Sequence, residues 1–121
     1  MILADTSIWV DHLRAGDAEL ARLLDRGGIA AHPLVVAELA LGSLRNRREV
    51  LALLDGLPRA PEATLAEVRV LIEAQPLHSR GIGYVDAALL ASCRLAPGLR
   101  LWTRDRRLAA LAAEAGLAAP A

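Results

Sequence analysis

The sequence contains no lysine and no phenylalanine, and it has only one tyrosine, two tryptophans and one cysteine among 121 residues. Without lysine it can form no P-loop, which needs that side chain on the phosphates, and it lacks the lysine normal beside the acidic pocket of a phosphoacceptor receiver domain. The single Cys93 excludes an internal disulfide. With so few aromatic side chains, the core must be aliphatic and no stacking platform for bases is expected.

Long hydrophobic runs are also missing. No apolar stretch reaches the roughly 18 residues that a membrane span requires. Asp5 comes too early for a signal peptide, and no basic or long apolar region precedes it. Cys93 lies in an apolar helical run and is expected to be a buried free thiol, which suits a reducing compartment. We therefore expect a soluble, cytoplasmic protein that does not bind membranes.

The charged residues balance, with fourteen acidic residues and fourteen basic ones that are all arginine. A neutral chain has no global attraction for nucleic acid, so any such binding must be local. The arginines gather in two clusters, at 45, 47 and 48 and at 104, 106 and 107. Arginine binds phosphate in a bidentate manner, but such clusters are also found on solvated helix faces.

Short apolar runs alternate with helical patterns along the chain, which at this length predicts one domain over residues 1–121. The predicted strands are residues 1–4, 29–31, 57–60, 99–102 and 117–119. The predicted helices begin after Asp5, after Asp17, at Pro33, before Val50, at about residue 62, at about residue 84 and after Asp105. This alternation predicts an α/β fold with a parallel sheet covered on both faces.

Four acidic residues interrupt apolar segments: Asp5, Glu38, Asp86 and Asp105. A carboxylate on an apolar element costs desolvation free energy unless a partner compensates it. Asp5 and Asp105 follow predicted strands, so they are expected at the same edge of a parallel sheet. Glu38 shares a helix face with Leu34, Val35 and Leu41 and is expected to face the core. Asp86 lies in the first turn of its helix, so all four acids can converge.

Converging carboxylates repel one another, and a divalent cation removes that repulsion. The absence of His and Cys from the set argues against zinc and favours Mg²⁺ or Mn²⁺. A site of this kind suits phosphodiester hydrolysis, because the metal activates water and offsets charge on the phosphate.

Structural explanations exist for three of the acids. Asp5 and Asp105 could be simple helix N-caps, and Asp86 could interact with the helix dipole. Glu38 is the hardest to explain structurally. Thr6, Ser7 and Thr103 could orient metal-bound waters or act as ordinary caps, and His12, His32 and His78 show no metal-ligand spacing.

Four motifs carry a resemblance to a known family. The segments 1–12, 34–42, 81–92 and 101–108, each with one of the four acids, resemble in order the acidic motifs of PIN-domain ribonucleases, specifically VapC toxins of type II toxin–antitoxin pairs. The resemblance covers residues 1 to about 116. Tyr84 stands where the family commonly has Trp, and the region of about 46–78 carries no motif.

This resemblance implies a three-layer α/β/α PIN-like domain with a parallel sheet of about five short strands. It implies an Mg²⁺-dependent endoribonuclease, with Mn²⁺ able to substitute. Asp5 and Asp86 would be direct metal ligands, and Glu38 and Asp105 would complete the catalytic site. It also implies a VapB-like antitoxin partner, a homodimer, and contact with DNA only through the antitoxin.

Three hypotheses follow. The first is the endoribonuclease toxin, with Arg80, Arg104, Arg106 and Arg107 as candidate phosphate contacts on the rim. The second is a non-catalytic PIN-like module that binds RNA or a protein partner. The third is a metal-dependent phosphatase of another α/β family, which the absence of lysine and the presence of Ser7 two residues after Asp5 disfavour.

Overall fold

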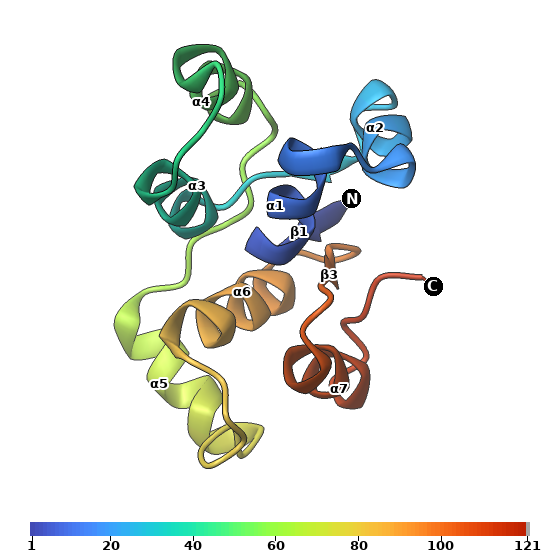
Figure 1. Ribbon diagram of the computed structural model, residues 1–121. Helices are drawn as coiled ribbons and strands as arrows, with labels where there is room; N and C mark the ends of the chain where they lie inside the picture. Colours follow the sequence, from blue (N-terminus) through green and yellow to red (C-terminus); the bar gives the residue numbers. More distant parts are fainter. Residues whose placement is uncertain (121) are drawn as a thin grey trace.

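A computed structural model describes residues 1–120 of the chain (Figure 1). Short apolar runs form strands, and capped amphipathic segments between them form helices. In chain order, the described elements are β1 (Ile2–Ala4), α1 (Thr6–Ala15), α2 (Ala18–Asp25), β2 (Ile29–Ala30), α3 (Pro33–Leu41), α4 (Arg47–Asp55), α5 (Leu65–Ala74), α6 (Tyr84–Leu95), β3 (Arg100–Trp102) and α7 (Arg106–Glu114).

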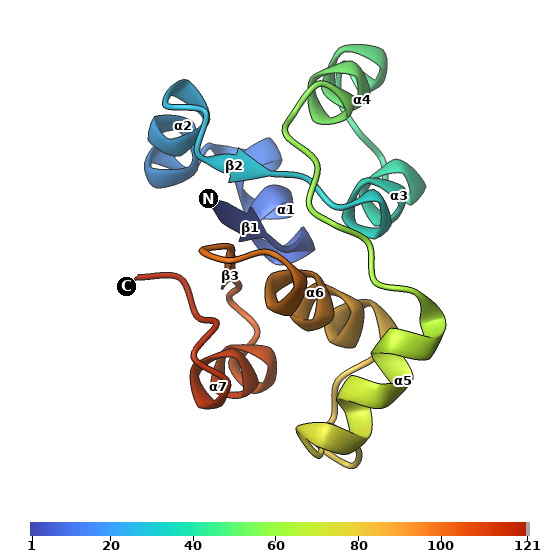
Figure 2. The same cartoon turned by 180° about the vertical axis from the view of Figure 1, so that it is seen from behind.

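The three strands form a parallel sheet in the order β2–β1–β3. Leu3 of β1 lies opposite Ala30 of β2 and Leu101 of β3, and all three residues are buried. Figure 2 shows β2 beside β1, with α2 next to it. The prediction of an α/β fold built on a parallel sheet is confirmed.

The expectation of about five strands is wrong, because the described residues form three. The two remaining predicted segments, 57–60 and 117–119, each form a single parallel bridge: Ala31 pairs with Arg59, and Leu101 pairs with Ala118. At the first bridge, the Ala31 N–H donates to the Pro58 carbonyl at 2.8 Å. Pro58 and Pro61 bracket this segment and Pro120 follows the other one, and proline has no N–H with which to extend a ladder.

Helices cover the sheet. α1 packs against β1, α2 against β2, and both α6 and α7 against β3. In both views α2 and α7 lie to one side of the strands, and α3 and α6 to the other (Figures 1 and 2). α6 is the most deeply buried helix, since every residue from Ala87 to Cys93 is buried. This explains why its sequence is almost continuously apolar after Asp86.

Cys93 is confirmed as a buried free thiol. Burial raises its pKa to about 12, so it stays protonated and unreactive at neutral pH. Within residues 1–120, the structure has no helix that is both long and apolar enough to cross a membrane.

Candidate active site

Asp5 and Asp105 lie at the same edge of the sheet, as expected. Asp5 directly follows β1, and its N–H donates to the Trp102 carbonyl at 3.0 Å, which continues the pairing of β1 with β3. Both acids also cap helices: Asp5 accepts from the Ile8 N–H at 3.3 Å, and Asp105 accepts from the Arg107 N–H at 2.9 Å and the Leu108 N–H at 3.0 Å. The capping explanation is therefore correct for both, and it leaves open a chemical role for their other oxygens.

Two hydroxyls hold the Asp5 carboxylate, which is only 6% exposed. Ser7 Oγ donates to Asp5 Oδ1 at 2.5 Å, and Thr103 Oγ1 donates to Asp5 Oδ2. Each hydroxyl also accepts a backbone N–H from the loop after β3: Ser7 from Arg104 at 3.1 Å and Thr103 from Asp105 at 3.0 Å. This network fixes Asp5 and at the same time ties the loop that carries Asp105 to the start of α1.

Asp86 lies near the other three acids, and their charges affect its pKa. It lies in the first turn of α6, where its Oδ2 accepts from the Gly83 N–H at 3.3 Å. Burial raises the pKa of Asp86, the negative charges of Asp105, Asp5 and Glu38 raise it further, and the Gly83 hydrogen bond opposes the shift. Asp105, Asp5 and Glu38 are thus close enough to Asp86 for their charges to act on it.

Glu38 is not turned toward the core, and that expectation is wrong. The side chain is exposed, and Leu41, which was expected to share its buried face, is 89% exposed. α3 instead buries Val35 and Leu39, and one helical step separates Glu38 from that buried stripe. Glu38 faces α1, where its Oε1 accepts from Thr6 Oγ1 at 2.5 Å. Glu38 therefore approaches the site from an exposed face of α3, beside α1, and not from the buried core.

The donor set suits a hard divalent cation, because it consists of carboxylate oxygens. The side chains as placed do not yet form a ligand shell: no group of three or more His, Cys, Asp or Glu side chains in residues 1–120 is arranged to hold a metal ion. Each acid instead turns one or both oxygens toward a hydroxyl or a backbone N–H.

Sequence reasoning did not identify the main task of the hydroxyl residues. Thr6 holds Glu38, and Ser7 and Thr103 hold Asp5. All three therefore position acids directly, where water-orienting or capping roles were expected. The signal in the sequence was their placement one or two residues from Asp5 and Asp105.

Two of the four rim arginines form ion pairs with carboxylates, and Arg106 and Arg107 form none within residues 1–120. Arg80 forms a bidentate pair with Glu114, with oxygen distances of 2.9 and 3.3 Å. Arg104 donates to Asp11 at 2.7 Å and also pairs with Asp17. These ion pairs make Arg80 and Arg104 poor candidates for phosphate contacts.

The glycine-rich segment before Asp86 is fastened to α7. Gly81 has a φ of +80°, which favours glycine, and a Cβ there would come within 2.7 Å of Arg107 Nη1, so the Arg107 side chain would have to move. Arg107 Nη1 also donates to the Gly81 carbonyl at 3.4 Å, and the Arg80–Glu114 pair joins the same two segments. The segment before Asp86 is therefore held to α7 at two points.

His32 caps the helix that carries Glu38. It is 2% exposed, and its Nδ1 accepts from the Leu34 N–H at 3.0 Å at the start of α3. Burial lowers the pKa of His32 below its ordinary value of 6.5, with Glu62 opposing the shift. The neutral ring is required for capping, since a protonated ring has no acceptor nitrogen.

We expect stability to fall as the pH drops below 6.5, because the unfolded chain then binds a proton that folded His32 does not. Replacing His32 with Asn keeps a capping acceptor and should remove about 1 kcal/mol of this pH-dependent loss. Urea denaturation between pH 7 and pH 5 measures the effect, with exposed His78→Asn as the control. An unchanged pH dependence in the His32 variant would contradict this.

Comparison with known proteins identifies the family of this chain. The PIN domain family profile matches residues 2–114. Two proteins named Ribonuclease VapC32, from Mycobacterium tuberculosis strains CDC 1551 / Oshkosh and ATCC 25618 / H37Rv, are each 52% identical over 118 residues, which cover 98% of this chain and 95% of the relative. The chain therefore belongs to the PIN domain family and, within it, to the VapC type.

Proposed function

We propose that this protein is a metal-dependent endoribonuclease and the toxin of a type II toxin–antitoxin pair. The observation that supports the proposal is the hydrogen-bond network in which Ser7 and Thr103 join Asp5 to the loop carrying Asp105, with Thr6 next to Asp5 bonded to Glu38. The charges of these three acids also raise the pKa of Asp86. The ribonuclease named in the two relatives supports RNA as the substrate.

The residues have distinct tasks in this proposal. Asp5 and Asp86 would hold an Mg²⁺ or Mn²⁺ ion, and Glu38 and Asp105 would complete its surroundings from α3 and from the start of α7. When bound, the ion supplies charge compensation for the phosphate and lowers the pKa of a water. Ser7 and Thr103 keep Asp5 oriented, which limits the reorganisation that binding requires.

The VapC type also supports a set of partners. We propose that a VapB-like antitoxin covers the acidic site, that the protein acts as a homodimer, and that it reaches DNA only through the antitoxin. We propose a cytoplasmic location, where the RNA substrate and a reduced Cys93 thiol are both found.

Cleavage of cellular RNA should require a divalent ion. The purified protein is expected to cut RNA with Mg²⁺ or Mn²⁺, and an excess of chelator should reduce the rate to background, because the repelling carboxylates then lack their counter-charge. Re-adding Mn²⁺ should restore cutting. Cleavage that continues in chelator, or that survives Asp5→Asn, would contradict the proposal.

The alternative is a PIN-like module that binds RNA or a protein partner without cutting. It is favoured by one observation: the acids in residues 1–120 are not arranged as a ligand group. Mn²⁺ titration distinguishes the two functions, because a pure binding module has no need to take up the ion at its carboxylates.

A further inference from the structure

Of the rim arginines, Arg106 forms no ion pair within residues 1–120, and a further group of arginines available for phosphate lies away from the rim. Arg80 and Arg104 are paired with carboxylates, whereas Arg45, Arg47 and Arg48 form no ion pair with any residue of 1–120. These three are exposed and lie in the α3–α4 connection and the first turn of α4. The cluster at 45, 47 and 48 is thus the one whose members all lack a carboxylate partner within residues 1–120.

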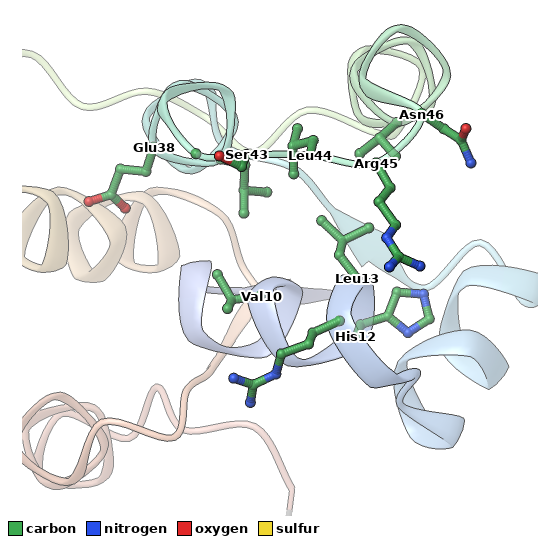
Figure 3. A pocket seen from close by; sticks show the side chains of 12 residues that line it. Val10, His12, Leu13, Glu38, Ser43, Leu44, Arg45 and Asn46 are labelled. Carbon is green, nitrogen blue, oxygen red and sulfur yellow. The ribbon is translucent and has the colours of Figure 1, made fainter.

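A groove of about 710 Å³ runs between this connection and α1 (Figure 3). Its size lies within the range of about 300–1,000 Å³ that is usual for ligand sites. Glu38 of the candidate active site lines it on α3, and Arg45 and Arg14 line it farther along. Figure 3 shows Arg45 extending from the connection toward His12 of α1, well away from Glu38. The groove is therefore continuous with the site.

The backbone of the α3–α4 connection holds Arg45 on its wall of the groove. Asn46 has φ 51° and ψ 46°, a left-handed conformation that Asn tolerates better than most residues. The chain reverses there, and Arg47 Nη1 donates back to the Gly42 carbonyl at 3.3 Å, closing the connection on itself. Arg14, on the opposite wall, is 75% exposed in its pair with Asp11, and such a surface pair holds it only weakly.

From this we propose that the groove between α1 and the α3–α4 connection binds the RNA strand next to the cleavage site, with Arg45 and Arg14 contacting backbone phosphates. The inference rests on the proposed function and names the surface by which the substrate is held. Recognition there is of the backbone, because the groove walls offer no Trp, Tyr or Phe for stacking.

RNA fits the groove better than a protein segment does, for reasons of charge. The groove places two arginines on facing walls, and its one acid, Glu38, belongs to the site where a metal would neutralise it. A polyanion that enters the acidic site must be held by cations nearby, and two of the four rim arginines, Arg80 and Arg104, are paired with carboxylates. The apolar residues Leu13, Leu39 and Leu44 would then line the floor under the riboses.

The test measures RNA binding without cleavage. A labelled single-stranded RNA of mixed sequence is titrated by fluorescence anisotropy against the full chain carrying Asp5→Asn, in Mg²⁺. Adding Arg45→Gln or Arg14→Gln should raise Kd about fivefold each and lower the slope of log Kd against log salt by about 0.7. The matched control is Arg69→Gln on α5, an exposed arginine without an ion pair in residues 1–120, which lies at the end of the molecule remote from α4 (Figure 1). This control should keep Kd and slope.

The inference is overturned if Arg45→Gln and Arg14→Gln bind this RNA as the parent does, or if the Arg69 control weakens binding equally. It is also overturned if these variants lose only the binding of a partner protein, which would assign the groove to that partner. Because the readout is binding, it remains informative if no cleavage is found: failure to cut refutes the nuclease, and unchanged Kd values refute the groove.

Discussion

Asp86→Asn is expected to abolish RNA cleavage and yet to stabilise the metal-free protein. The two effects have the same cause, since the charge that would bind the ion is held in a half-buried position among three other acids. We expect cleavage in Mg²⁺ to fall by about three orders of magnitude. The metal-free variant should be more stable than wild type at pH 7 and should unfold at a higher Tm, because the half-buried charge is removed.

The sign of the stability effect follows from the raised pKa of Asp86. The folded protein keeps its proton to a higher pH than the unfolded chain, whose carboxyl titrates near 3.8. Stability is therefore lost as the pH rises from 3.8 through the folded pKa, and the loss is complete above it. Asn has no such proton, so the gain of the variant should be full at pH 7 and should vanish below pH 3.8.

Thermal unfolding in chelator from pH 3 to pH 7, with and without Mn²⁺, measures both effects. Asn retains an acceptor for the Gly83 N–H, so capping of α6 is preserved. Asp25→Asn, an exposed acid at the end of α2, is the matched control and should change neither cleavage nor Tm. A metal-free Asp86 variant that is less stable than wild type at pH 7 would show that the acids do not repel one another there.

The positions of Asp5 and Asp105 at the strand ends were predictable from the sequence, and the exposed position of Glu38 was not. Asp5 and Asp105 follow short apolar runs, and in a parallel sheet that alone places them together. Glu38 was placed by counting apolar neighbours within one helix, but the buried face of α3 is decided by contact with α1 and α4, which a local count cannot see. Its exposure shows that the four acids differ: Asp5 is buried, Asp86 is partly buried, and the other two are exposed.

The sheet shows the same limit. Five apolar segments were correctly placed in pairing positions, yet only three became strands. Prolines beside the two outer segments limit each of them to a single bridge. Their effect depends on whether the missing N–H would have faced the neighbouring strand, which the sequence alone does not show. The arginines were assigned to the rim from proximity in sequence, whereas Arg80 and Arg104 found carboxylates 34 and 93 residues away.

Thr103→Val should show that a hydroxyl keeps the metal-binding acid in place. Valine matches the shape of threonine but cannot donate to Asp5 Oδ2 or accept from the Asp105 N–H, so two polar groups near the site lose their partner. We expect a stability loss of about 1–3 kcal/mol. We expect cleavage and Mn²⁺ affinity to fall about 10–100-fold, as is usual when a group that orients a metal ligand is removed.

Thr103→Ser separates this role from a purely structural one, because serine keeps the hydroxyl and loses only a methyl group. It should recover Mn²⁺ affinity and cleavage to within about threefold of wild type. Both variants are assayed well below their Tm, so that unfolding does not contribute to the result. A valine variant with wild-type Mn²⁺ affinity would mean that Ser7 alone is sufficient to hold Asp5, since Ser7 Oγ occupies the other carboxylate oxygen. Ser7→Ala combined with Thr103→Val should then lose more than the sum of the single changes, because the two hydroxyls share one carboxylate.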